Sequence, residues 1–219
     1  MATRQLLAEL TFAHERATGR RAVIEAVGGV DAAKRVQAGE AFDVVVLAAD
    51  TLSKLEAAGA IVPGSVVNLV HSGVAVAVRA GAALPDIGTE DALRDAVLAA
   101  SSISLSTGPS GVALGRLFEH WGIAKTIAPR MVQAPPGVPV GSLVAAGQVD
   151  LGFQQLSELL HVQGITIVGP LPASIQITTT FSAGVGAHAR QADAARELLA
   201  YMASPAAAEA KRRQGMDPA

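Results

Sequence analysis

The residues best suited to bind a ligand form one loop, Ser106-Thr107-Gly108-Pro109-Ser110-Gly111, between a short apolar run and a helix. A loop at a helix N-terminus offers backbone N–H groups, hydroxyls and the positive end of the helix dipole. These groups bind anions without lysine or arginine. The loop therefore predicts an oxyanion or carboxylate ligand, and the alternative is an ordinary strand–helix turn. The following helix is expected to bury one face, made of Leu114, Leu117, Phe118 and Trp121.

Composition limits the other functions open to the chain. Of 219 residues, 50% are hydrophobic and 16% charged, so a substantial core can form, while 3% aromatics leave that core to smaller side chains. A net charge of −2 without a basic patch excludes nucleic acid as a partner. The absence of cysteine excludes disulfides, thiol catalysis and cysteine–zinc sites. No apolar run is long enough for membrane insertion, which needs about 18 residues.

The first residues, from Met1 to Leu10, lack the basic and continuous apolar regions of a signal peptide. As it stands, the sequence predicts a cytoplasmic protein. If upstream residues are missing, the prediction becomes periplasmic.

Strands and helices alternate along the chain, which predicts an α/β fold with mixed, mostly parallel sheets flanked by helices. The expected strands are 22–27, 43–48, 73–80, 103–105, 130–134, 149–154, 165–168 and a β-rich stretch 175–185. The expected helices are 6–18, 30–39, 51–58, 89–99, the one that follows the 106–111 loop, 140–146, 155–161 and 194–202. A Pro-rich break, 135–139, separates two of these elements.

The order of elements also predicts two lobes. The first comprises 1–80 and 175–219 and the second 84–170, with hinges near 78–85 and 170–181. Ligands of such folds bind at the carboxyl ends of the strands, in the cleft.

Several motifs resemble the type II periplasmic binding proteins, in particular the molybdate-binding-protein-like branch of transporter substrate-binding proteins. The similar segments cover nearly the whole chain. They are 28–33 with 36–39, 42–50, 106–111, 143–155 and 204–207.

This resemblance implies a hinged clamp that needs no cofactor and works with an ABC permease. The implied ligand contacts are Gly28, Gly29, Val30 and Asp31 in the first lobe, and Ser106, Thr107, Gly108, Ser110, Gly111, Pro139, Val140, Gln154 and Gln155 in the second. Molybdate binders usually carry serines at the first of these positions, and this chain has none. Gln155 stands about where they carry tyrosine, and its amide suits a carboxylate or hydroxy-acid oxygen.

In the resembled family a β-strand precedes the first helix, whereas Met1 falls almost at the start of that helix here. We therefore expect unpaired backbone groups on the strands 22–27 and 43–48. Upstream residues, a neighbouring chain in an oligomer with a swapped strand, or a rearranged segment would then fill the gap.

The same branch contains an enzyme class, aconitate isomerase, which moves a proton within a tricarboxylate. Such chemistry needs a general base and donors for the carboxylates. The candidate bases are Asp31, His71, Glu158 and His161. Each has a structural alternative: a helix N-terminal residue for Asp31, a turn for His71, an exposed helix face for Glu158 and a helix cap for His161. The histidines have no metal-ligand spacing, and His120, beside Trp121, is expected to be structural.

Three functions follow from these patterns. The first is a solute-binding protein for a small oxyanion or organic carboxylate. The second is a cofactor-free isomerase of a polycarboxylate. The third is a cytoplasmic ligand sensor.

Overall fold

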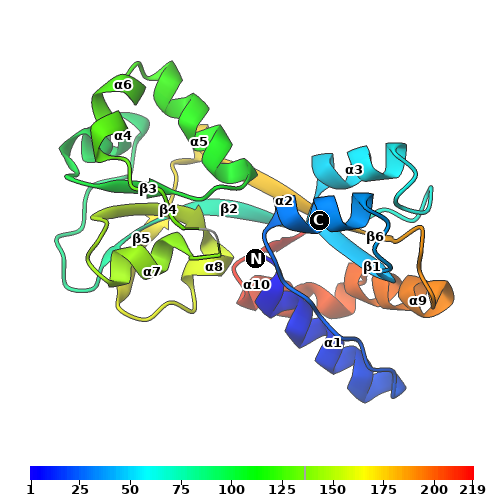
Figure 1. Ribbon diagram of the computed structural model, residues 1–219. Coiled ribbons are helices and arrows are strands. Elements are labelled where there is room, and N and C mark those ends of the chain that lie inside the picture. Colours follow the sequence, from blue (N-terminus) through cyan, green and yellow to red (C-terminus); the bar gives the residue numbers. More distant parts are fainter. Residues whose placement is uncertain (136) are drawn as a thin grey trace. The chain divides into compact units, whose positions relative to one another are not determined.

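The computed structural model describes residues 1–135 and 137–219, so Pro136 in the predicted Pro-rich break lies outside the described residues. It confirms an α/β protein with a mixed sheet flanked by helices (Figure 1). The chain forms two compact units, one of Met1–Ser72 with Thr179–Ala219 and the other of Gly73–Thr178. The hinges predicted near 78–85 and 170–181 stay predictions.

The first unit packs helices on both faces of its strands. Its elements are α1 (Arg4–Thr18), α2 (Gly29–Gln37), β1 (Val44–Ala48), α3 (Ala49–Ala57), the first part of β2 (Val67–Arg79), most of β6 (Thr178–Val185), α9 (Ala192–Ala203), η3 (Pro205–Ala207), α10 (Ala208–Arg213) and β7 (Asp217–Pro218). One apolar core joins α1, α9 and α10 to β2 and β6. A second core joins α2 and α3 to the other face of β1. Alternation along β1 explains this, since Val45 and Leu47 are buried in the second core while Val44 and Val46 pack against the first.

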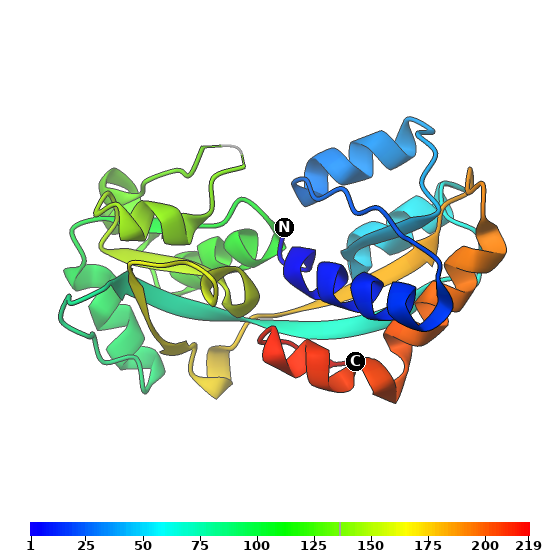
Figure 2. The same cartoon turned by 90° about the horizontal axis from the view of Figure 1, so that it is seen from below.

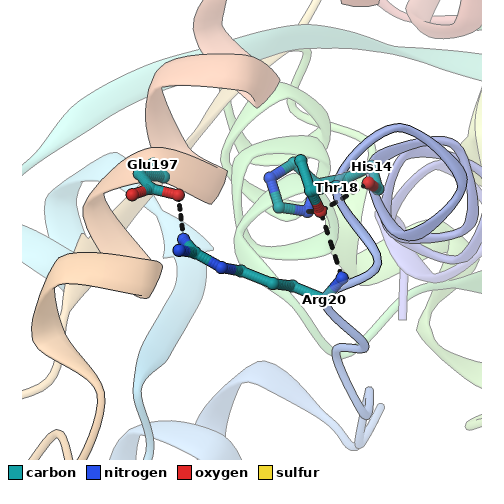
Figure 3. Close-up of polar contacts among 4 residues, drawn as sticks. All are labelled: His14, Thr18, Arg20 and Glu197. Atoms are coloured by element: carbon teal, nitrogen blue, oxygen red, sulfur yellow. Dashed lines mark hydrogen bonds and ion pairs between the residues drawn. The ribbon is translucent and has the colours of Figure 1, made fainter.

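The helix α1 confirms the predicted opening helix. Leu6, Leu7 and Leu10 are buried, and Gly19 ends the helix in the left-handed conformation, with φ 74°. Beyond this end, the Thr18 hydroxyl accepts a hydrogen bond from the Arg20 N–H, and the Arg20 guanidinium pairs with Glu197 of α9 (Figure 3). The turn after α1 is thereby tied to α9.

The second unit has the same layered construction. Its elements are the second part of β2, α4 (Glu90–Ala99), β3 (Ile103–Leu105), α5 (Pro109–His120), α6 (Ala124–Ile127), η1 (Ala128–Arg130), α7 (Val140–Ala145), β4 (Leu151–Gln155), α8 (Leu156–Leu159), β5 (Ile165–Pro170) and η2 (Ala173–Ile175). Its largest core joins α4, α5 and α6 to β2, β3 and β4. Figure 1 shows these helices on one face of the sheet, with α7 and α8 on the other.

Within this unit, β3 and β4 run parallel, with Leu105 beside Phe153. The carboxyl ends of both strands therefore lie at one edge of the sheet, where the 106–111 loop follows β3 and the two glutamines end β4. This edge positions the candidate site.

Two predicted strands do not form. Residues 20–28 have no regular secondary structure; they run from the end of α1 back to the start of α2 (Figure 2), and the Met1 amino group lies 3.4 Å from the Val27 carbonyl oxygen. The expectation of unpaired backbone groups is therefore wrong for 22–27, which is not a strand. It stays a prediction for the strand 43–48, since β1 pairs with β6 and ends the strand order of the described sheet. The 130–134 segment makes only an isolated bridge, between Met131 and Ile103.

The share of parallel pairing is smaller than predicted. β1–β6, β2–β4, β2–β5 and β2–β7 are all antiparallel. A parallel sheet is usually built from consecutive strands joined by crossover helices. Here β2 is instead the neighbour of strands that come much later in the chain. Among the described residues, no helix combines the length and apolar character needed to cross a bilayer.

Candidate functional site

The 106–111 loop folds tightly onto the first turn of α5. Gly108 precedes the helix, and Pro109 occupies the first position, where a missing N–H costs nothing. The hydroxyls of Ser106 and Ser110 lie 2.9 Å apart, and Ser110 is buried. A Cβ on Gly111 would stand 1.7 Å from the Ser106 carbonyl oxygen, so only glycine permits this approach of loop and helix.

The start of α5 retains a free donor. The N–H groups of Gly111 and Val112 both donate to the Gly108 carbonyl, at 3.0 and 3.2 Å. The Ser110 N–H has no protein acceptor within residues 1–135 and 137–219. Together with the dipole of a 12-residue helix, this favours a negatively charged group at the loop.

A groove of about 540 Å³ opens beside this loop, entirely within the second unit. Its lining is Leu105, Ser106, Thr107, Gly111, Val112, Met131, Val132 and Gln133. None of these side chains is charged, so the groove combines hydroxyl and amide groups with an apolar wall. The structure thus brings three of the predicted ligand residues, Ser106, Thr107 and Gly111, to one groove.

Sequence reasoning missed three residues that also line the groove, Met131, Val132 and Gln133. The Val132 N–H donates to the Ile103 carbonyl at 2.8 Å, which holds this segment beside β3. The signal was present in the β-type pattern of 130–134, since an extended segment there needs a neighbour. What the pattern lacked was any indication that the neighbour is β3.

The two glutamines at the end of β4 have separate surroundings. Gln154 is buried, and its Oε1 accepts the Gly141 N–H at 3.1 Å, in the first turn of α7. Gln155 is also buried, and alternation places it on the face of Phe153, which packs against Phe118 of α5 with ring centroids 5.9 Å apart. Gln155 therefore lies on the α5 face of the sheet, as a ligand role at that helix requires.

Pro139 and Val140, which were predicted to contact the ligand, form the start of α7 and pack within the protein. Pro139 precedes the first turn, and its carbonyl accepts the Ser142 N–H at 3.0 Å. Val140 is 1% exposed and its side chain packs where a Cβ on Gly152 would lie. Neither side chain lines the groove described above.

The sequence suggested an exposed helix face for Glu158, and this expectation is wrong. Glu158 lies half-buried on α8, and burial raises the pKa of its carboxyl group above the usual value. A carboxyl with a raised pKa suits proton transfer near neutral pH.

The other candidates are dispersed. Gly28 precedes α2 and Gly29, Val30 and Asp31 form its first turn, all exposed and all in the first unit. His71 lies inside β2, not in a turn, with its Nδ1 3.0 Å from the Thr180 hydroxyl. His161 follows α8 and is exposed, and His120 ends α5. No group of three potential metal ligands occurs in the described part of the chain.

The comparison with known families identifies the class of protein. Residues 1–217 match the family described as bacterial extracellular solute-binding protein, and the chain belongs to this family.

Individual relatives extend this result. An aconitate isomerase from Pseudomonas sp is 39% identical over 216 residues, which is 96% of this chain and 82% of that protein. The molybdate-binding protein of Azotobacter vinelandii has a TM-score of 0.81 at 22% identity, covering 98% of this chain and 95% of the other. PEB3, solved with L-phospholactate bound, has a TM-score of 0.76 at 15% identity, covering 100% and 96%. The structural likenesses confirm the type II periplasmic binding protein fold.

Proposed function

We propose that this chain is a solute-binding protein for a small organic carboxylate, held in the groove at the start of α5. The observation that carries the proposal is the composition of the groove, which combines neutral donors at a helix N-terminus with the apolar side chains of Leu105, Val112, Met131 and Val132. A carboxylate group would take the donors, and the apolar wall would contact a carbon skeleton, which an inorganic oxyanion lacks. As in the resembled transporters, the loaded protein would deliver its ligand to an ABC permease.

The proposal is tested by titration calorimetry and thermal shift with citrate, cis- and trans-aconitate, tricarballylate, molybdate, tungstate and sulfate. A carboxylate should raise the melting temperature by mass action, and the inorganic anions should not. Ser110→Ala removes the hydroxyl that bonds to Ser106 and should weaken carboxylate binding by about 1–3 kcal/mol, or roughly 5–150-fold in Kd. Binding of molybdate alone, or an unchanged Kd in the variant, would refute the assignment.

A second function, isomerisation of an unsaturated tricarboxylate, is favoured by the 39% identical aconitate isomerase. Under this proposal the groove binds one carboxylate of the substrate, and a nearby base moves a proton between two of its carbons. The test is proton NMR of cis- and trans-aconitate incubated with the protein in D₂O. Interconversion with deuterium incorporated at carbon supports catalysis, and binding without either supports transport alone.

A further inference from the structure

A short extended segment just before the Pro-rich break brings an amide side chain to the groove. Met131 forms a parallel bridge with Ile103, and the Val132 N–H donates to the Ile103 carbonyl at 2.8 Å. The segment therefore runs beside β3 and in the same direction. Two residues further along both segments, this register brings Gln133 level with Leu105, the last residue of β3.

Alternation along the segment determines the face on which Gln133 lies. Met131 packs against the core that joins α4, α5 and α6 to the sheet, and residues two positions apart in an extended segment share a face. Gln133 is therefore on the α5 face of the sheet, beside the loop that begins α5. Gln133 and three residues of that loop, Ser106, Thr107 and Gly111, line the same groove.

The Gln133 amide retains hydrogen-bonding capacity for a ligand. The residue is exposed, and its Nε2 lies 3.5 Å from the Ala134 carbonyl oxygen, longer than the usual N–H···O distance of about 2.7–3.2 Å. A glutamine amide has two N–H donors and one acceptor oxygen. Within residues 1–135 and 137–219, at least one of these N–H groups has no protein acceptor, so it can donate to a bound carboxylate.

The neighbouring polar side chains are placed differently. Arg130, the one cation of this segment, donates from its guanidinium to the Leu98 and Ala100 carbonyl oxygens, both at 2.7 Å. Gln155 is on the α5 face as well, but it is buried and does not line the groove. Among the described residues that line the groove, Gln133 is thus the one with a side-chain amide.

We propose that Gln133 makes the groove specific for short dicarboxylates. The inference rests on the proposed binding of a carboxylate at the start of α5. One carboxylate of the ligand accepts the donors of the 106–111 loop, and the other accepts an N–H of Gln133 about one strand spacing away, ~4.8 Å. Roughly two or three methylene groups cover this span, at about 1.5 Å per carbon–carbon bond. These methylenes contact the apolar side chains of Leu105 and Met131, which also line the groove.

The first measurement compares ligands that differ only at the far end. Succinate and butyrate have equal numbers of carbons, as do glutarate and valerate, but each dicarboxylate ends in a carboxylate where its counterpart ends in a methyl group. Calorimetric titration of the wild type should give a Kd about tenfold lower for each dicarboxylate than for its counterpart, the effect of one hydrogen bond to a charged group.

The second measurement uses matched variants of Gln133. Gln133→Met keeps an unbranched side chain of the same length and removes the amide, so the Kd for succinate and glutarate should rise about tenfold. The Kd for butyrate and valerate should stay within about threefold. Gln133→Glu keeps the size but replaces the donor by a charged oxygen, and it should also abolish the preference for dicarboxylates. Gln148→Met is the control, since Gln148 is exposed in the same unit and does not line the groove, and all four Kd values should stay within about twofold.

The outcomes separate this inference from the proposed function beneath it. A wild type that binds no carboxylate overturns both. A wild type that binds each dicarboxylate no more tightly than its monocarboxylate counterpart overturns the second contact and leaves carboxylate binding standing. A preference for dicarboxylates that survives in Gln133→Met overturns the role of Gln133. Equal losses for mono- and dicarboxylates in that variant would show a residue that only shapes the groove, and would overturn the role as well.

Discussion

Gly111 offers the sharpest test of the loop geometry. An alanine Cβ at this position would stand 1.7 Å from the Ser106 carbonyl oxygen, whereas real Cβ contacts essentially never fall under 3.0 Å. The Ser106 backbone and the helix must therefore separate by about 1.3 Å, the difference between these distances. Forced displacement of this kind costs typically about 1–3 kcal/mol. The shift also moves Ser106 from Ser110, so at least one ligand hydrogen bond should be lost.

We expect Gly111→Ala to lower the free energy of unfolding by about 1–3 kcal/mol and to weaken carboxylate binding about tenfold or more. Urea unfolding and calorimetric titration measure the two effects. Gly115→Ala is the matched control, because Gly115 lies on the same helix and a Cβ there would meet no atom within 4 Å. That change should stabilise the protein by up to about 1 kcal/mol and leave Kd unaltered. If Gly111→Ala changes the free energy of unfolding and the Kd no more than Gly115→Ala does, the close approach of Gly111 to Ser106 does not exist, and the proposed geometry of the binding loop is refuted.

Two further predictions concern stability. The buried Ser104 hydroxyl has no hydrogen-bond partner among the described residues, so Ser104→Ala should raise the free energy of unfolding by about 1 kcal/mol. Ser102→Ala removes a hydroxyl that accepts the Asp150 N–H at 2.9 Å but keeps the Ser102 carbonyl, which accepts the same N–H at 3.2 Å, so it should lower the free energy of unfolding by up to about 1 kcal/mol. Equal signs in urea unfolding would contradict this. The hydrogen bond from Arg213 lowers the pKa of Glu9 below 4.5, so this pair stabilises the fold above that pH and the effect disappears as pH falls through the lowered pKa. Glu9→Gln should therefore cost roughly 0.2–1 kcal/mol at pH 7 and nothing at strongly acidic pH, and an equal cost at both would be evidence against it.

Sequence patterns predicted the structure correctly where it depends on contacts within a single short segment. Thr89 caps α4, which lies within the helix expected at 89–99, by accepting the Ala92 N–H at 3.1 Å. The 106–111 loop was likewise identified from residue types alone. Such elements depend on contacts within a few residues, which a single sequence contains.

The failures involve partners that are distant in the chain. The 22–27 segment has β-type residues, yet Val23 is 81% exposed, because no strand lies beside the segment to bury it. Gln154 and Gln155 are adjacent and chemically identical, and only the pleat and the position of α7 separate a structural amide from one on the α5 face. Glu158 has an ordinary position on a short helix, and its burial depends on elements that the sequence did not place there.

The neutral lining of the groove has a consequence for the conditions under which it can work. A ligand held by lysine or arginine loses affinity as ionic strength rises, because dissolved ions screen exposed charges over about 10 Å at 0.1 M salt. Hydroxyls and backbone N–H groups act at contact distance, so dissolved ions screen only the smaller contribution of the α5 dipole. Capture by this groove should therefore vary little between dilute and saline media. Selection among anions would then depend on the shape and apolar surface of the ligand and not on its total charge.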